Sequence, residues 1–131
     1  MKISWLGVGK LGMPCAEAIA LKGHTVNGYD TEYRKSLLVK MFPTISGAVQ
    51  GADIVFVAVP TPHDPDYDGR DPTAHLEPKD FDYSIVKEVL LEANKHMTKD
   101  QLLVLISTVL PGTTRRDFVH LVTNTRFVYN P

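Results

Sequence analysis

The chain has 131 residues, 44% of them hydrophobic and 22% charged, and a formal net charge of -1 at pH 7. This length suffices for one domain with its own core. The balanced charge excludes the strong positive field of proteins that attract nucleic acid or anionic membranes. No apolar run nears the roughly 20 residues of a membrane-spanning helix, and the first residues read as a strand, not as a secretory leader. A single cysteine, Cys15, excludes an internal disulfide and a cysteine-based metal site, so we expect a cytoplasmic protein.

The first thirty residues have the order of a dinucleotide-binding unit. A short expected strand leads into Gly7-Val8-Gly9-Lys10-Leu11-Gly12, a G-x-G-x-x-G turn, and a helix is expected over residues 10–22. Gly7 permits the tight turn, Gly9 lets the backbone approach a pyrophosphate, and Gly12 lets the helix pack closely on the strand. The free N–H groups at the start of that helix would face the phosphates.

Asp30 closes a second expected strand, residues 24–29. A carboxylate at this position accepts hydrogen bonds from the ribose hydroxyls of NAD and repels the 2′-phosphate of NADP, so the sequence favours NAD. Arg34 and Lys35 are close in sequence and would tolerate a phosphate, which leaves NADP as the alternative. Asp30 is also suited to cap a helix over residues 31–38, and the two roles are compatible.

The rest of the chain alternates between expected strands and helices. Its clearest element is the buried strand 52–60, apolar at almost every position, as a parallel strand covered on both faces should be. The other expected elements are a third strand or helix end at 37–39, a helical turn at 46–51, a helix at 83–96 capped by Asp82, a strand at 101–106, a helix at 113–122 and a strand at 126–129. The pattern predicts the α/β class, with a Rossmann-like, doubly wound, mainly parallel sheet in a single three-layer domain.

Two polar strand ends fall where ligands bind in such a sheet, beyond the carboxyl ends of the strands. Thr61 stands between Pro60 and Pro62 after the buried strand, and Ser107-Thr108 follows strand 101–106. Thr61 is therefore a candidate cofactor contact, with a purely turn-forming role as the alternative.

Residues 61–80 are polar and rich in turn-forming residues, and we expect no regular structure there. Long loops of this kind are usually functional or mobile. His63, Asp64, Asp66 and Asp68 carry groups that bind metals, but the run does not fit the D-x-[DN]-x-[DN]-G calcium loop, and prolines interrupt it. We favour a loop over the edge of the active site and expect no metal site.

Four motifs occur in a fixed order along the chain. They are Gly7-Val8-Gly9-Lys10-Leu11-Gly12-Met13-Pro14, Gly28-Tyr29-Asp30 with Lys35, Val59-Pro60-Thr61-Pro62, and Ser107-Thr108-Val109-Leu110-Pro111-Gly112-Thr113-Thr114. Together they resemble the N-terminal NAD-binding domain of the UDP-glucose/GDP-mannose dehydrogenase family of nucleotide-sugar dehydrogenases, and the resemblance extends over nearly all of residues 1–131. It implies an enzyme that uses two NAD molecules to oxidise a sugar C6 alcohol to a carboxylate.

The resemblance also implies roles for single residues. The glycine turn would hold the pyrophosphate, with Leu11 behind the cofactor, while Asp30 and Lys35 would contact the adenosine ribose. Thr61 would lie on the nicotinamide side, and Thr108 beside the nicotinamide and the catalytic water, where a hydroxyl orients its partner and does not act as a base. The residues thus assigned to the cofactor are Gly7, Val8, Gly9, Lys10, Leu11, Gly12, Asp30, Lys35, Val59, Pro60, Thr61 and Thr108, and Thr108 is also assigned to catalysis.

The sequence departs from the family pattern at several points. The family has an aromatic residue where Lys10 stands and a longer segment between Asp30 and Ala52. Its catalytic glutamate follows the proline that matches Pro131, and its nucleophilic cysteine and catalytic lysine come later, in central and C-terminal substrate domains that are absent here. Cys15, on the first expected helix, cannot replace that nucleophile. We therefore expect this chain, as a fragment or a minimal stand-alone form, to be catalytically incomplete alone.

Two other functions stay open from the sequence. One is a non-catalytic NAD-binding module, and the other is a domain of a related 3-hydroxyacid or 6-phosphogluconate-type dehydrogenase, which shares the fold and the glycine turn. The S-T-x-x-P-G-T element argues against the latter. In every case NAD is the expected cofactor. We expect a nucleotide-sugar substrate only with a second domain and no nucleic-acid or membrane partner, and we leave a homo-oligomer open.

Overall fold

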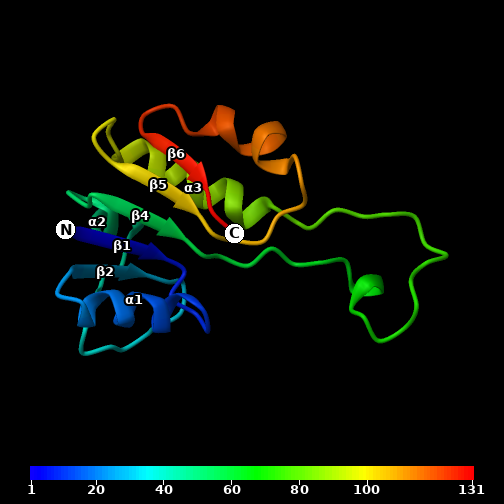
Figure 1. Cartoon of the computed structure of the whole chain (residues 1–131), viewed down its shortest axis with the longest axis horizontal. Coiled ribbons are helices and arrows are strands. Elements are labelled where there is room, and N and C mark those ends of the chain that lie inside the picture. The colour runs from blue at the N-terminus through cyan, green and yellow to red at the C-terminus, as the bar shows by residue number, and fades with distance from the viewer.

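The computed structural model describes all residues, 1–131, and contains one sheet of six parallel strands in the order β3-β2-β1-β4-β5-β6 (Figure 1). The strands are β1 (Lys2–Leu6), β2 (Thr25–Tyr29), β3 (Val39–Met41), β4 (Ile54–Val57), β5 (Leu102–Leu105) and β6 (Arg126–Tyr129). The helices are α1 (Gly12–Leu21), α2 (Ile45–Val49), η1 (Pro65–Tyr67), α3 (Ser84–His96), η2 (Thr114–Phe118) and η3 (Val119–Leu121). The strand order reverses between β1 and β4, as in a doubly wound dinucleotide-binding sheet.

Two apolar clusters on opposite faces of the sheet make the domain three-layered, as predicted. The larger cluster lies between the sheet and the helices α2, α3 and η2, and includes the fully buried Leu90, Val55 and Phe118. The smaller cluster lies between the sheet and α1, and includes Trp5 and Ala16. Figure 1 shows α1 separated from α2 and α3 by the sheet. None of the helices has the length and apolar character needed to cross a membrane.

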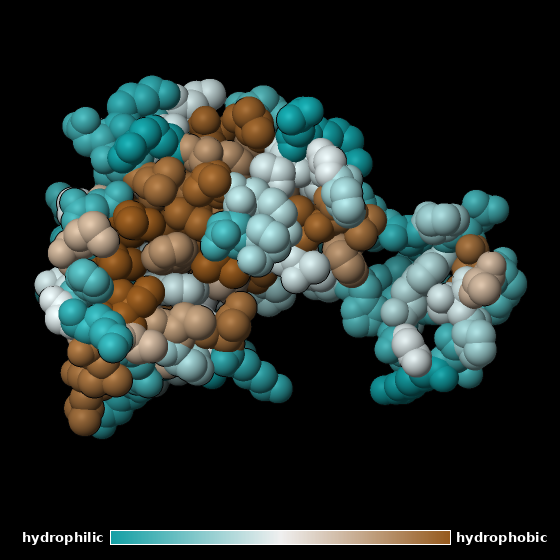
Figure 2. Space-filling model, viewed as in Figure 1, coloured by the Kyte–Doolittle hydropathy of each residue, from teal (hydrophilic) through white to brown (hydrophobic).

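The α1 side of the sheet is covered unevenly. Trp5 stacks on Phe56 at 4.7 Å between ring centroids, and the register continues the same face from Phe56 to Val104 and Val128. No helix lies over this half, and Val128 is 43% exposed. Parallel sheets normally have both faces buried. Here an apolar surface is left beside α1, visible as the brown area in the middle of the molecule in Figure 2.

The predicted helix over 31–38 is wrong. The chain runs without regular structure from Asp30 to β3, so that residues 37–39 belong to a strand and its approach and not to a helix end. The Ser36 hydroxyl explains the path, because it accepts from the backbone N–H groups of Leu38 and Val39 and donates to Glu17 on α1. A helix would have needed those N–H groups for its own bonds.

The prediction of a single α-helix over 113–122 is also wrong, because this segment forms two short helical turns of other types. η2 is a π-helical turn, in which the Val119 N–H donates to the Thr114 carbonyl five residues earlier, and η3 is a 3₁₀ turn. The wide turn followed by a tight one still places Phe118 in the core. Single π-turns of this kind are frequent at functional sites.

Residues 63–81, called the arm below, project from the body of the domain (Figure 1). The expectation of no regular structure holds except for η1. The arm is closed at its base, where the Asp82 N–H donates to the Pro62 carbonyl at 2.8 Å. Its two limbs are joined by an ion pair between Lys79 and Asp64 at 2.8 Å and by the Tyr67 hydroxyl, which donates to the Glu77 carbonyl.

Candidate cofactor site

The glycine turn follows β1, and its three glycines meet different surroundings. Gly7 has φ +92°, and a Cβ there would lie 2.4 Å from the Ala58 carbonyl oxygen. A Cβ on Gly12 would lie 2.0 Å from the Gly7 carbonyl oxygen, whereas a Cβ on Gly9 would have no atom within 4 Å. Packing therefore requires glycine at positions 7 and 12. Gly9 faces open space, as it should if a pyrophosphate approaches the backbone there.

Asp30 is joined to the glycine turn by its carboxylate. Its Oδ2 accepts from the Val8 N–H at 2.9 Å, and its Oδ1 accepts from the Glu32 N–H at 3.0 Å. The residue caps a turn and not the expected helix. Each carboxylate oxygen can accept a second hydrogen bond, so the half-buried group is oriented by the backbone and still able to bind a ribose hydroxyl.

The basic side chains near the glycine turn and Asp30 differ in whether they form an ion pair. Lys10 and Lys35 are exposed and form no hydrogen bond or ion pair within the chain. Arg34 instead pairs with Glu32 at 2.6 Å. Of the two side chains considered for a 2′-phosphate, only Lys35 has no ion-pair partner within the chain. Leu11 is 59% exposed at the start of α1, available to contact a cofactor.

The carboxyl ends of β4 and β5 are tied together by hydroxyl groups. Thr61 Oγ1 donates to the Thr108 carbonyl at 2.9 Å, so the structure brings these two predicted residues together. The buried Ser107 hydroxyl accepts from the Val59 N–H at 3.0 Å and donates to the Val59 carbonyl at 2.7 Å. The Thr108 side chain is exposed, and its hydroxyl has no partner within the chain, which leaves it free for a ligand.

The two halves of the site adjoin at the strand-order reversal. A Cβ on Gly7 would lie 3.1 Å from Val59 Cγ1, so the turn after β1 is packed against the end of β4. One continuous edge therefore runs from Asp30 through the glycine turn and Val59 to Thr108. This is the crevice in which open α/β sheets bind dinucleotides.

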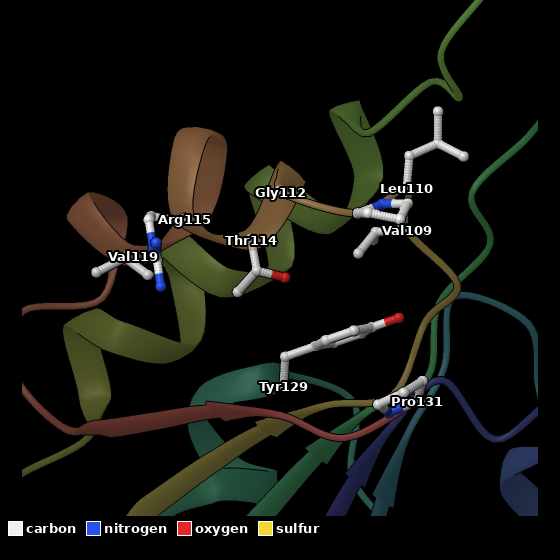
Figure 3. A pocket seen from close by; sticks show the side chains of 9 residues that line it. Val109, Leu110, Gly112, Thr114, Arg115, Val119, Tyr129 and Pro131 are labelled. Carbon is white, nitrogen blue, oxygen red and sulfur yellow. The ribbon is translucent and has the colours of Figure 1, made fainter.

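The same edge continues toward β6 as a hollow of about 680 Å³ (Figure 3). Figure 3 shows Thr114 above the ring of Tyr129, with Pro131 beside it and Val109 and Leu110 across the opening. The Thr114 hydroxyl is shielded from solvent and has no hydrogen-bond partner. The hollow is thus lined by apolar side chains together with the unpartnered Thr114 hydroxyl and the Arg115 side chain.

Sequence reasoning missed two residues at this edge, Ser107 and Tyr83. Ser107 was flagged only as the neighbour of Thr108, and nothing local indicates that its hydroxyl would hold Val59, 48 residues away. Tyr83 read as the first residue of a helix, yet its hydroxyl accepts from the Leu110 N–H at 3.1 Å. No three or more His, Cys, Asp or Glu side chains are placed to hold a metal ion.

Comparison with protein families decides the identity of the domain. The model of the UDP-glucose/GDP-mannose dehydrogenase family, NAD binding domain, matches residues 37–130. The chain belongs to this family. A second model, the NAD binding domain of 6-phosphogluconate dehydrogenase, matches residues 2–69. Both models describe NAD-binding domains, and NAD is therefore the cofactor of this domain. None of the curated proteins matches the sequence.

Solved structures share the fold at low sequence identity. GDP-mannose dehydrogenase from Pseudomonas aeruginosa is 21% identical with a TM-score of 0.78, and the alignment covers 100% of this chain and 36% of that one. UDP-glucose dehydrogenase from Pyrobaculum islandicum is 24% identical with a TM-score of 0.69, covering 98% and 34%. The 3-hydroxyisobutyrate dehydrogenase of Mycobacterium tuberculosis is 19% identical with a TM-score of 0.75, covering 99% and 40%. The chain thus spans only about a third of the two nucleotide-sugar dehydrogenases.

Proposed function

We propose that this domain holds NAD for the oxidation of a nucleotide sugar, with the cofactor lying along the edge from Asp30 to Thr108. Asp30 would accept from the adenosine ribose hydroxyls, the backbone at Gly9 would approach the pyrophosphate, and Thr61 and Thr108 would lie beside the nicotinamide. The observation that carries the proposal is the hydrogen-bonded continuity of this edge, joined from Asp30 to Val8 and from Thr61 to Thr108. The open space at Gly9 fits the closest backbone approach.

The residues of this chain supply binding and orientation in the proposed reaction. NAD, when bound, accepts the hydride removed from the sugar alcohol. The free Thr108 hydroxyl is suited to orient a group beside the nicotinamide. No thiol stands at this edge, since Cys15 is half-buried on α1 and packs with the α1-side cluster. A covalent intermediate needs a thiolate at the substrate carbon, so we propose that a second, substrate-binding domain completes the site.

Titration calorimetry with NAD tests the binding part of the proposal. We expect saturable binding that weakens about tenfold or more in Asp30→Ala, equivalent to about 1.4 kcal/mol. Thr73→Ala, in the arm, is the matched control and should bind as the unaltered chain does. Absence of binding at millimolar NAD would overturn the proposal.

A turnover assay tests whether the chain needs a second domain to oxidise a nucleotide sugar. The chain alone, mixed with NAD and either UDP-glucose or GDP-mannose, should produce no NADH, because the edge offers no nucleophile. Robust NADH production by the chain alone would contradict the need for a second domain.

A 3-hydroxyacid or 6-phosphogluconate-type dehydrogenase is the second candidate. It is favoured by the 6-phosphogluconate dehydrogenase model over residues 2–69 and by the fold shared with 3-hydroxyisobutyrate dehydrogenase. The match of the nucleotide-sugar dehydrogenase model over residues 37–130 includes both strand ends, and for this reason we prefer the nucleotide-sugar assignment. A cytoplasmic location stays a prediction, and whether the chain forms a homo-oligomer stays open.

A further inference from the structure

Tyr83 stands where the arm returns to the body of the domain, and its ring is fixed by packing. The residue is 6% exposed. Its ring meets Phe118 of η2 edge-on at 5.6 Å and Phe81 at 6.2 Å between centroids. Edge-to-face pairs of this kind hold an aromatic ring in one orientation. The direction of the Tyr83 hydroxyl is therefore set by the core.

That hydroxyl joins the arm to the turn after β5. It donates to Asp80 Oδ1 in the arm and accepts from the Leu110 N–H at 3.1 Å. Leu110 lies two residues beyond Thr108, whose unpartnered hydroxyl we place beside the nicotinamide. A phenol has one proton to donate and accepts through its lone pairs, so both of its hydrogen-bonding roles are used at this point.

Asp80 is held in turn by a residue of η2. Its Oδ2 accepts from Arg116 Nη2 at 2.8 Å, and Arg116 also pairs with Asp117 at 2.7 Å. Burial and the bond to Asp80 raise the pKa of the Tyr83 phenol, while the phenol's hydrogen bond holds the pKa of Asp80 below its usual value. The phenol therefore keeps its proton, and the carboxylate stays charged, throughout the neutral range.

The turn that carries Thr108 is fixed on both sides by these contacts. Before Thr108, the Ser107 hydroxyl is bonded to Val59, and after it the Leu110 N–H is bonded to Tyr83. Thr108 and Leu110 are themselves exposed, and Val109 between them packs against the larger apolar cluster. The hydrogen bonds therefore add to a single packing contact in orienting the turn. Preorganised polar groups in a site depend on such supporting hydrogen bonds.

We propose that Tyr83, held by Asp80 and Arg116, is a positioning residue for Thr108 and hence for the nicotinamide half of NAD. The inference rests on the proposed function, because it needs NAD on this edge. It predicts that the arm, through Asp80, is coupled to the nicotinamide side of the site but not to the adenosine side, which is built by Asp30 and the glycine turn.

Calorimetry with two ligands tests this inference. Tyr83→Phe keeps the ring and removes the hydroxyl, and it should bind NAD about threefold to tenfold more weakly than the unaltered chain. ADP-ribose, which lacks the nicotinamide, should bind with unchanged affinity. Tyr67→Phe removes the tyrosine hydroxyl within the arm, whose partner is the Glu77 carbonyl, and is the matched control; it should change neither affinity.

If Tyr83 only supported the fold, Tyr83→Phe would weaken the binding of NAD and of ADP-ribose together, or would weaken neither. Either result would overturn the inference. Arg116→Gln gives the second test. It removes the ion pair with Asp80, and because the Arg116 side chain is exposed, it leaves the core unchanged. Arg116→Gln should weaken NAD binding and leave ADP-ribose binding unchanged, even if Tyr83→Phe does not fold. Unchanged NAD affinity in Arg116→Gln would then refute the inference. An unaltered chain that binds neither ligand would overturn the proposed function and this inference with it.

Discussion

Alanine at Gly9 and at Gly12 separates the two physical roles of glycine within one turn. At Gly9 the added methyl group meets no atom within 4 Å, and φ is not in the left-handed region. Stability should therefore stay within about 0.5 kcal/mol of the unaltered chain, or rise by about that amount because alanine restricts the unfolded state. The methyl group would instead occupy space that we assign to the pyrophosphate. NAD affinity should then fall at least about tenfold, or about 1.4 kcal/mol.

At Gly12 the opposite outcome is expected. A methyl group 2.0 Å from the Gly7 carbonyl oxygen forces α1 away from the strand end. Overpacking against backbone costs about 3 kcal/mol, which lowers the melting temperature of a domain of this size by about 10 °C. Thermal unfolding followed by circular dichroism measures stability, and calorimetry with NAD measures binding. Unchanged NAD affinity in Gly9→Ala, or an unchanged melting temperature in Gly12→Ala, would refute this account of the turn.

Three further predictions follow from the site and its supporting contacts. Asp30→Ser should raise the affinity for NADP relative to NAD, because it removes the charge that repels a 2′-phosphate; an unchanged NADP-to-NAD ratio in calorimetry would argue against Asp30 as the ribose contact. Ser107→Ala should destabilise the domain by about 1–3 kcal/mol in urea unfolding, because it leaves the Val59 N–H and carbonyl without their partner, whereas Thr108→Ala should be neutral to stability. Stability should fall as the pH drops below about 4, because the tyrosine and arginine hydrogen bonds hold the pKa values of Asp80 and Asp117 below their usual range, so the folded state resists their protonation. The fall should be shallower in Asp80→Asn, and a parallel acid-unfolding curve would count against the Asp80 contribution.

Local sequence patterns sufficed for much of the fold. The continuous apolar run 52–60 predicted a strand covered on both faces, and its core is β4, the fourth strand in the order of the sheet. The strand is confirmed, but only one face is fully covered: Val55 and Val57 are buried, whereas Ile54 and Phe56 on the α1 side are partly exposed. The two helix predictions that were wrong, 31–38 and 113–122, were made on propensity and capping alone. In the first, a serine side chain takes the N–H groups that a helix would use, and in the second the hydrogen bonds follow π and 3₁₀ spacing.

By itself, the sequence determined the glycine turn, the acid after β2 and the hydroxyls after β4 and β5, because each depends on residue types at fixed short spacings. Only the tertiary structure decided how these groups meet. Asp30 reaches Val8 over 22 residues, Tyr83 reaches Leu110 over 27, and Arg116 reaches Asp80 over 36. The first pair forms because parallel strands bring their carboxyl ends to one edge, and the other two form because the segments that follow β4 and β5 return to the same end of the domain. No local pattern records which side chains will face each other there.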